Sequence, residues 1–150
     1  MQDEAHALLK AIFEERIPFN KLLGLSVGAL GAQDIAVSFN LEQSLIGNPS
    51  KKILHGGVIA SVIDAAGGVA VGRNLIDRMG DSSLKELGVK LTKMGTIDMR
   101  VDYLRPGVGE KFVCTAYPLR FGRKVAVVRT EFHNENRDLI AAGVASYIVS

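Results

Sequence analysis

The residues best suited to chemistry lie between His55 and Asp64. His55, Gly56 and Gly57 directly precede a run of about 20 mostly small and β-branched residues, which predicts a helix that is apolar on every side. The first N–H groups of a helix have no partner inside it, and the helix dipole adds positive potential at the same end. The N–H of Gly57 has no side chain beside it to block a ligand. We therefore expect this N–H to face outward, free to polarise a carbonyl or to hold an oxyanion.

Asp64 is the one carboxylate in the middle of this predicted helix. It follows Gly57 by seven residues, about two turns, and its neighbours in sequence are apolar. Burying a carboxylate is costly unless it has a partner or takes part in chemistry. An ion pair with an arginine, or a cap on another element, would explain Asp64 without function. A role as general base or nucleophile is the functional alternative.

Other reactive residue types are poorly placed for chemistry. The three histidines, His6, His55 and His133, lack the spacing of metal ligands, so no metal site is predicted. Cys114 is the single cysteine, which excludes an internal disulfide, and we interpret it as a small buried hydrophobe. Ser61 lacks the Gly-x-Ser-x-Gly elbow of serine hydrolases and is interpreted as a helix-packing residue.

The composition restricts the broad class of protein. A chain of 150 residues predicts one domain, residues 1–150, that needs neither a disulfide nor a metal for stability. Its 18 basic and 16 acidic residues are spread along the chain, and a formal charge of +2 is too weak for a nucleic-acid groove. No apolar run is long enough to span a membrane, and the N-terminus is acidic where a signal peptide is basic. We therefore expect a cytoplasmic protein that binds neither nucleic acid nor membrane.

The pattern of elements predicts an α+β fold. An N-terminal helix covers residues 1–18, the buried helix starts at Gly56, and residues 73–95 form a polar connection with at most one short helical turn. Strands are expected over residues 25–30, 35–41, 96–104, 111–120, 124–133 and 139–149, with hairpins joining the first two and turning at residues 121–123. Strands that cluster after a central helix favour an antiparallel sheet curved around that helix.

The sequence resembles a known family in its central segment, in the segment from Gly95 to Pro106 and in two later segments, residues 120–132 and 139–149. The central segment is LHGGVIASVIDAAGG, residues 54–68, which resembles the signature of hotdog-fold acyl-CoA thioesterases of the phenylacetate-degradation (PaaI-like) branch. That signature has an upstream Asn, a His-Gly-Gly and an acid nine residues after the His, matched here by Asn48, His55 and Asp64. The segment from Gly95 to Pro106 resembles the family's next strand, which opens with Ser or Thr. The resemblance covers roughly residues 20–150, and the connection at 73–95 departs from it.

The resemblance implies a fold, an assembly and a set of roles. The fold would be a hotdog, an antiparallel sheet wrapped around one long helix, in a homodimer or a dimer of dimers with the site between subunits. Gly57 N–H would polarise the thioester carbonyl, and Asp64 of the partner chain would be general base or nucleophile. Asn48 would orient water or substrate, His55 would support the loop, and Thr96 would position the water.

The resemblance also suggests how coenzyme A would bind. Gly122, Arg123 and Lys124 at the predicted hairpin turn would contact its phosphates, and Gly56 would contact the substrate. Without the resemblance, the same basic residues are equally consistent with a solvated hairpin tip. No separate cofactor is expected, because coenzyme A arrives as part of the substrate.

Three functions are compatible with this fold. The first is an acyl-CoA thioesterase that hydrolyses a thioester to a carboxylic acid and free CoA. The second is a non-catalytic module that binds or senses acyl-CoA, for which a carboxylate such as Asp64 at the reacting bond would have no use. The third is a hotdog dehydratase, but the proline-rich loop that precedes the catalytic helix of those enzymes is missing here. The sequence favours the thioesterase.

Overall fold

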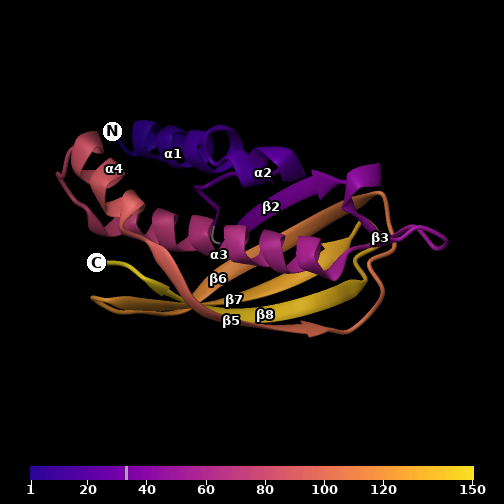
Figure 1. Ribbon diagram of the computed structural model, residues 1–150. Helices are drawn as coiled ribbons and strands as arrows, with labels where there is room; N and C mark the ends of the chain where they lie inside the picture. Colours follow the sequence, from indigo (N-terminus) through magenta and orange to yellow (C-terminus); the bar gives the residue numbers. More distant parts are fainter. Residues whose placement is uncertain (33) are drawn as a thin grey trace.

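The computed structural model describes residues 1–32 and 34–150 (Figure 1). Its helical segments are α1 (Gln2–Ala11), the π-helical turn η1 (Ile12–Arg16), α2 (Pro18–Leu23), the 3-10 turn η2 (Gln43–Leu45), α3 (Gly56–Arg78) and α4 (Leu84–Thr92). Its strands are β1 (Ser26–Val27), β2 (Ile35–Asn40), β3 (Ile46–Asn48), β4 (Ile53–Leu54), β5 (Gly95–Tyr103), β6 (Lys111–Phe121), β7 (Val125–Asn134) and β8 (Leu139–Ile148).

Six of the strands form one antiparallel sheet in the order β1-β2-β6-β7-β8-β5. The predicted hairpins are confirmed, because β1 pairs with β2 and β6 pairs with β7 on either side of the turn that contains Gly122. The connection between β1 and β2 includes Gln33, which lies outside the described residues. β5 pairs with β8 and is an outer strand of the sheet. β3 and β4 form a separate two-stranded ribbon just before α3.

Helix α3 is the middle layer of the molecule. The sheet lies on one side of it, and α1 and α2 lie on the other (Figure 1), which explains why its sequence is apolar all round. Its glycines permit this double packing. A Cβ at Gly67 would overlap the hydroxyl of Tyr147 on the sheet side, and a Cβ at Gly68 would lie 3.1 Å from the ring of Phe13 on the helix side.

The length and composition of α3 would also suit a membrane span. It has 23 residues and a mean hydropathy of 1.3 in its most apolar window, but 72% of that window is buried within this protein. Burial between the sheet and the N-terminal helices identifies α3 as a core helix. On the sheet side the core includes stacked rings of Phe39, Phe112 and Phe132 from three neighbouring strands, with centroids 5.4 and 5.7 Å apart along the stack.

The predicted boundaries of the connection after the central helix are wrong. The connection expected over residues 73–95 instead holds the last turns of α3, which ends at Arg78, and the whole of α4. α4 begins with a capping box in which Ser83 and Glu86 satisfy each other's backbone N–H groups, a signal present in the sequence. The N-terminal helical segment ends at Arg16, close to the predicted end near Pro18. Ile17 has extended backbone, and Pro18 begins the separate short helix α2, because a proline is tolerated in a helix's first turn.

Strand β5 departs from the predicted simple alternation. Its register against β8 shifts between Thr96 and Asp98, so Ile97 is the extra residue of a β-bulge. Simple alternation would place Ile97 on the same face as Met99, yet Ile97 is 55% exposed and Met99 is half-buried in the core. A bulge re-aims the side chains on either side of it. Here it turns Thr96 towards α3, where its hydroxyl meets Asp64.

Candidate active site

Asp64 is held by two side chains from neighbouring strands. Thr96 Oγ1 of β5 donates a hydrogen bond of 2.7 Å to Asp64 Oδ1, and Tyr147 Oη of β8 donates one of 2.9 Å to the backbone carbonyl of Asp64. Thr96 and Tyr147 are cross-strand partners, so one position on the sheet fixes both the carboxylate and the helix turn that carries it. Asp64 is half-buried and makes neither the arginine ion pair nor the cap that would have explained it without function. Among residues 1–32 and 34–150, no arginine forms an ion pair with Asp64, and the Asp64 side chain caps no helix.

Tyr147 is a rigid support for Asp64. It is 2% exposed, and burial, followed by the negative charge of Asp64, raises the pKa of its hydroxyl above the ordinary value. The hydroxyl therefore remains a donor at all physiological pH values. Gly67 is the residue that makes room for it, because any side chain at that position would overlap the hydroxyl.

The start of α3 differs from the free helix end that we expected. His55 is the N-cap residue, and its Nδ1 accepts a hydrogen bond of 2.8 Å from Gly57 N–H. The expectation that this N–H is unoccupied is therefore wrong for the single chain. Both residues are exposed, so no packing locks the imidazole in place. Because Nδ1 accepts, a neutral ring carries its proton on Nε2.

Asn48 lies at the end of β3, opposite Ile53 of β4. Its Oδ1 accepts a hydrogen bond of 2.9 Å from Ser50 Oγ, and its side chain is exposed. The ribbon places β3 against the start of α3, since a Cβ at Gly47 would come within 2.7 Å of His55 Cα. The structure thus brings Asn48 to the same end of α3 as His55, but away from Asp64.

The predicted residues form two groups that are separated along α3. Gly57 and Asp64 face the same side of the helix, two turns and about 10.5 Å apart, so one carbonyl cannot touch both within a chain. The turn at Gly122, Arg123 and Lys124 lies still further away. Phe121 at this turn packs against the guanidinium of Arg78, with 4.3 Å between the ring centroid and Arg78 Cζ. Arg78 is the last residue of α3. That residue is about 21 Å beyond Asp64 along the helix.

A cleft of about 590 Å³ opens beside Asp64 and Thr96. Its apolar lining comes from the segment that spans η1 and α2, from α3, and from the end of α4 with the residues that follow it. The apolar side chains include Phe13, Ile17, Phe19, Ala65, Leu91 and Met94. Its size lies within the range of small-molecule sites. The cleft was not predictable from the sequence, because its walls come from four segments, separated by more than 20 residues each, that meet only in the fold.

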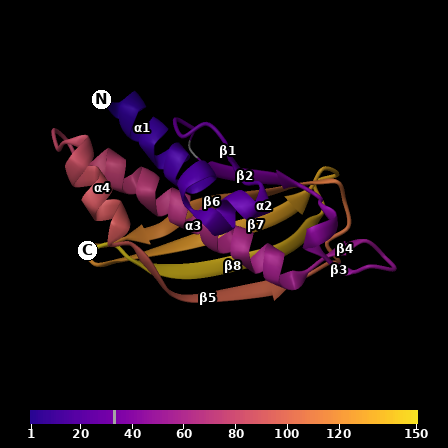
Figure 2. The same ribbon diagram turned by 45° about the horizontal axis from the view of Figure 1, so that its top comes forward.

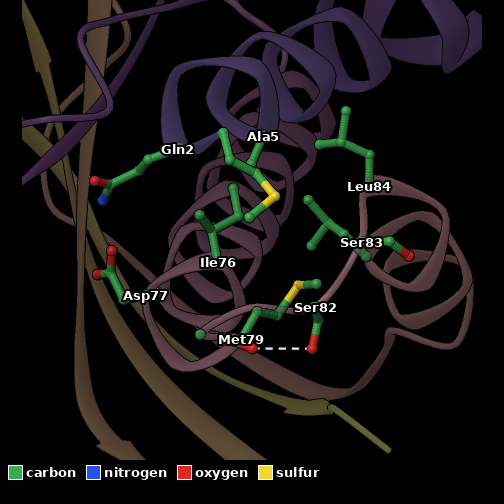
Figure 3. Close-up of a pocket in the computed structure, with 11 residues that line it drawn as sticks. Gln2, Ala5, Ile76, Asp77, Met79, Ser82, Ser83 and Leu84 are labelled. Carbon is green, nitrogen blue, oxygen red and sulfur yellow. Dashed lines mark hydrogen bonds between the residues drawn. The ribbon is translucent and has the colours of Figure 1, made fainter.

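A second cavity, of about 250 Å³, lies where α1 begins, α3 ends and α4 begins (Figure 3). Two of its polar side chains have partners: Asp77 pairs with Arg73 at 3.3 Å, and Ser82 Oγ donates to the Met79 carbonyl at 2.9 Å. It is remote from Asp64. We assign it no chemistry.

The other reactive residues have structural roles. Ser61 Oγ donates a hydrogen bond of 2.7 Å to the Gly57 carbonyl, one turn back along α3. Cys114 is fully buried, and burial raises the pKa of its thiol above the ordinary value, which keeps it protonated and unreactive. Within residues 1–32 and 34–150, no three His, Cys, Asp or Glu side chains are grouped as metal ligands would be.

Comparisons with known proteins identify the family of this chain. Residues 51–141 match the thioesterase superfamily. The medium/long-chain acyl-CoA thioesterase YigI of Salmonella typhimurium is 43% identical over 147 residues, which cover 98% of this chain and 95% of that protein. YigI of Escherichia coli K12 is 42% identical with the same coverage.

Solved structures show the same fold. A Shewanella oneidensis protein related to the thioesterase superfamily superposes with a TM-score of 0.92 at 40% identity, covering 99% of this chain and 97% of that one. A point mutant of the phenylacetic acid degradation protein PaaI from Thermus thermophilus superposes with a TM-score of 0.67. It is 21% identical and covers 89% and 99% of the two chains, so that likeness concerns the fold alone. The predicted hotdog architecture is confirmed. The chain belongs to the thioesterase superfamily and is a thioester hydrolase with a hotdog fold.

Proposed function

We propose that this protein hydrolyses medium- or long-chain acyl-CoA to a carboxylic acid and free CoA. One observation carries the proposal: the Asp64 carboxylate, held at one oxygen by Thr96, stands at an apolar cleft of about 590 Å³. An acyl chain is the part of the substrate that such a lining would bind. The names of the YigI relatives support the same substrate class.

In the proposed reaction, Asp64 activates water or attacks the thioester itself. As a general base, it takes a proton from water as the water oxygen bonds to the carbonyl carbon. As a nucleophile, it forms an anhydride with the acyl group, and water then hydrolyses the anhydride. On either route the tetrahedral intermediate expels the CoA thiolate, which is protonated to the free thiol. A thioester is sufficiently reactive that a carboxylate and an electrophile suffice, so we propose no metal or separate cofactor.

Gly57 N–H is the proposed electrophile. In the free chain it donates to His55 Nδ1 at 2.8 Å, so the substrate carbonyl must replace the imidazole as acceptor. Rotation of an exposed side chain is a small cost, and the N–H is kept oriented by the helix until the substrate arrives. His55 thus occupies the position of the substrate carbonyl in the free chain. Gly56, whose carbonyl accepts a hydrogen bond of 2.8 Å from Tyr103 Oη, is the proposed backbone contact to the substrate. Asn48, exposed at the same end, would orient water or substrate.

The site requires a second copy of the chain. A twofold axis that passes beside Ala60 and Ser61, midway between Gly57 and Asp64, would set each Gly57 next to the Asp64 of the partner chain. Ala60 and Ser61 are small and only half-buried, which suits close contact between two such helices. The outer strand β5 would lie near this axis because its Thr96 bonds to Asp64. We therefore propose a homodimer, or a dimer of dimers, with sites between subunits.

The CoA phosphates are assigned to Gly122, Arg123 and Lys124. Both basic side chains are exposed at the β6–β7 turn, which is anchored by the bond of 2.9 Å from Val149 N–H to the Lys124 carbonyl. A separation of about 21 Å along α3 between this end and Asp64 suits the long pantetheine arm that joins the phosphates to the thioester. Acyl-CoA is a cytoplasmic metabolite, and we propose that location for the enzyme.

Replacing both Arg123 and Lys124 by Ala should raise KM for acyl-CoA about tenfold and change kcat little, because the phosphates are bound equally in ground and transition states. Steady-state kinetics of CoA release measure both constants. Lys85→Ala, an exposed lysine of α4, is the matched control and should leave KM unchanged. A large fall in kcat at constant KM would contradict the assignment.

The proposed function is tested by incubating the purified protein with a panel of acyl-CoAs that differ in chain length and aromaticity. Free thiol, detected with a disulfide reagent, should appear with medium and long acyl chains. Free CoA should appear at least about a hundredfold more slowly with an Asp64→Asn protein. If no acyl-CoA in the panel is hydrolysed while binding is detected by calorimetry, the protein is a binding module and the proposal is wrong.

A further inference from the structure

The N-terminal helices cross α3 in matched steps. Leu9 lies over Gly72 and Phe13 lies over Gly68. The two segments therefore run antiparallel: a residue four positions later in the N-terminal segment lies over a residue four positions earlier in α3. Figure 2 shows the N-terminal helical segments in front of α3. A Cβ at Gly68 would lie 3.1 Å from two ring atoms of Phe13, and one at Gly72 would lie 2.6 Å from Leu9. No space remains between the two layers at either point.

The cleft beside Asp64 and Thr96 lies one helical turn further along the same two segments. Ile17, four residues after Phe13, lines the cleft together with Asp64 and Ala65, four and three residues before Gly68. The two layers are therefore apart at Asp64 and in contact at Gly68, about 6 Å further along the helix. Phe13 stands at this point of closure. Its ring lines the cleft on one side and rests on α3 on the other.

We infer that Phe13 is the residue that limits the length of the acyl chain that the cleft accepts along α3. This inference rests on the proposed thioesterase function. A chain attached to a thioester at Asp64 and directed along α3 meets the Phe13 ring before any other side chain of this crossing. Beyond the ring, the fully buried Leu9 covers Gly72. Loss of the ring would join the cleft to the space above Gly68, while a larger ring would shorten the cleft.

The test is the chain-length profile of kcat/KM for straight-chain acyl-CoAs in Phe13→Ala and Phe13→Trp. For Phe13→Ala the optimum should move to longer chains, since each methylene that gains apolar room is worth about fourfold in kcat/KM. For Phe13→Trp the optimum should move to shorter chains. Leu8→Ala is the matched control, because Leu8 packs against the core from the preceding helix α1 without lining the cleft. It should lower the melting temperature and leave the profile unchanged.

The outcomes separate this inference from the proposed function. Opposite shifts in the two Phe13 variants support the role of Phe13, and unchanged profiles in both overturn it. If Phe13→Trp does not fold, Phe13→Ala alone decides, and the absence of a shift towards longer chains overturns the inference. Failure of the unmodified protein to hydrolyse any acyl-CoA would instead refute the proposed function.

Discussion

Replacing Asp64 by asparagine should lower kcat by about 10²–10⁴-fold and leave KM nearly unchanged, the range expected for loss of a general base. Asparagine keeps the volume of the side chain and can still accept the hydrogen bond from Thr96, 2.7 Å long in the native protein. It cannot take a proton from water or form an anhydride. Asp64→Glu should retain intermediate activity, because the carboxylate remains but moves by about one methylene. The measurement is steady-state release of CoA.

The matched control for this prediction is Asp77→Asn on the same helix. Asp77 pairs with Arg73 at the far end of α3, so its loss should affect stability slightly and turnover not at all. Melting temperatures measured on the same samples separate a catalytic loss from a folding defect. A folded Asp64→Asn protein that retains turnover within a few-fold of the native value would show that the active site lies elsewhere.

Mixing two inactive variants should restore about a quarter of the native activity if each site uses residues from two chains. The first variant is Asp64→Asn. The second is Gly57→Pro, which removes the N–H while proline remains tolerated in the first turn of a helix. Random exchange makes about half of the dimers hybrid, and each hybrid has one site with both a native Gly57 and a native Asp64. The measurement is CoA release after the two proteins have been unfolded together and refolded.

Two controls make the mixing experiment decisive. Each variant unfolded and refolded alone should stay inactive, and Gly57→Ala should be less damaging than Gly57→Pro because it retains the N–H. The added Cβ of that control would lie 3.0 Å from His55 Nδ1, a contact that an exposed imidazole can relieve by rotating. No recovery in a mixture shown by sedimentation to contain hybrid dimers would mean that Gly57 and Asp64 do not act across subunits.

Much of the fold was predictable because its signals are local. The alternation of apolar residues located β6, β7 and β8, and the turn around Gly122 located their first hairpin. The absence of a polar face on α3 predicted its burial. Helix α4 was missed although its capping box was present, since a short helix with a mixed surface has weak periodicity. The bulge at Ile97 was missed because nothing in the alternation of β5 marks an extra residue.

The order of residues along the chain is enough to show which groups are available for chemistry. Asp64 and Gly57 fall on one face of one helix, and that relation follows from helical periodicity alone. What each group contacts depends on the tertiary structure. Tyr147 reaches the Asp64 carbonyl from 83 residues away, and Thr96 reaches the carboxylate through a bulge in an outer strand. His55 occupies the Gly57 N–H, and Phe13 closes the cleft above Gly68. These contacts depend on how the sheet, α3 and the N-terminal helices pack in three layers, and short-range patterns along a chain carry no information about distances between layers.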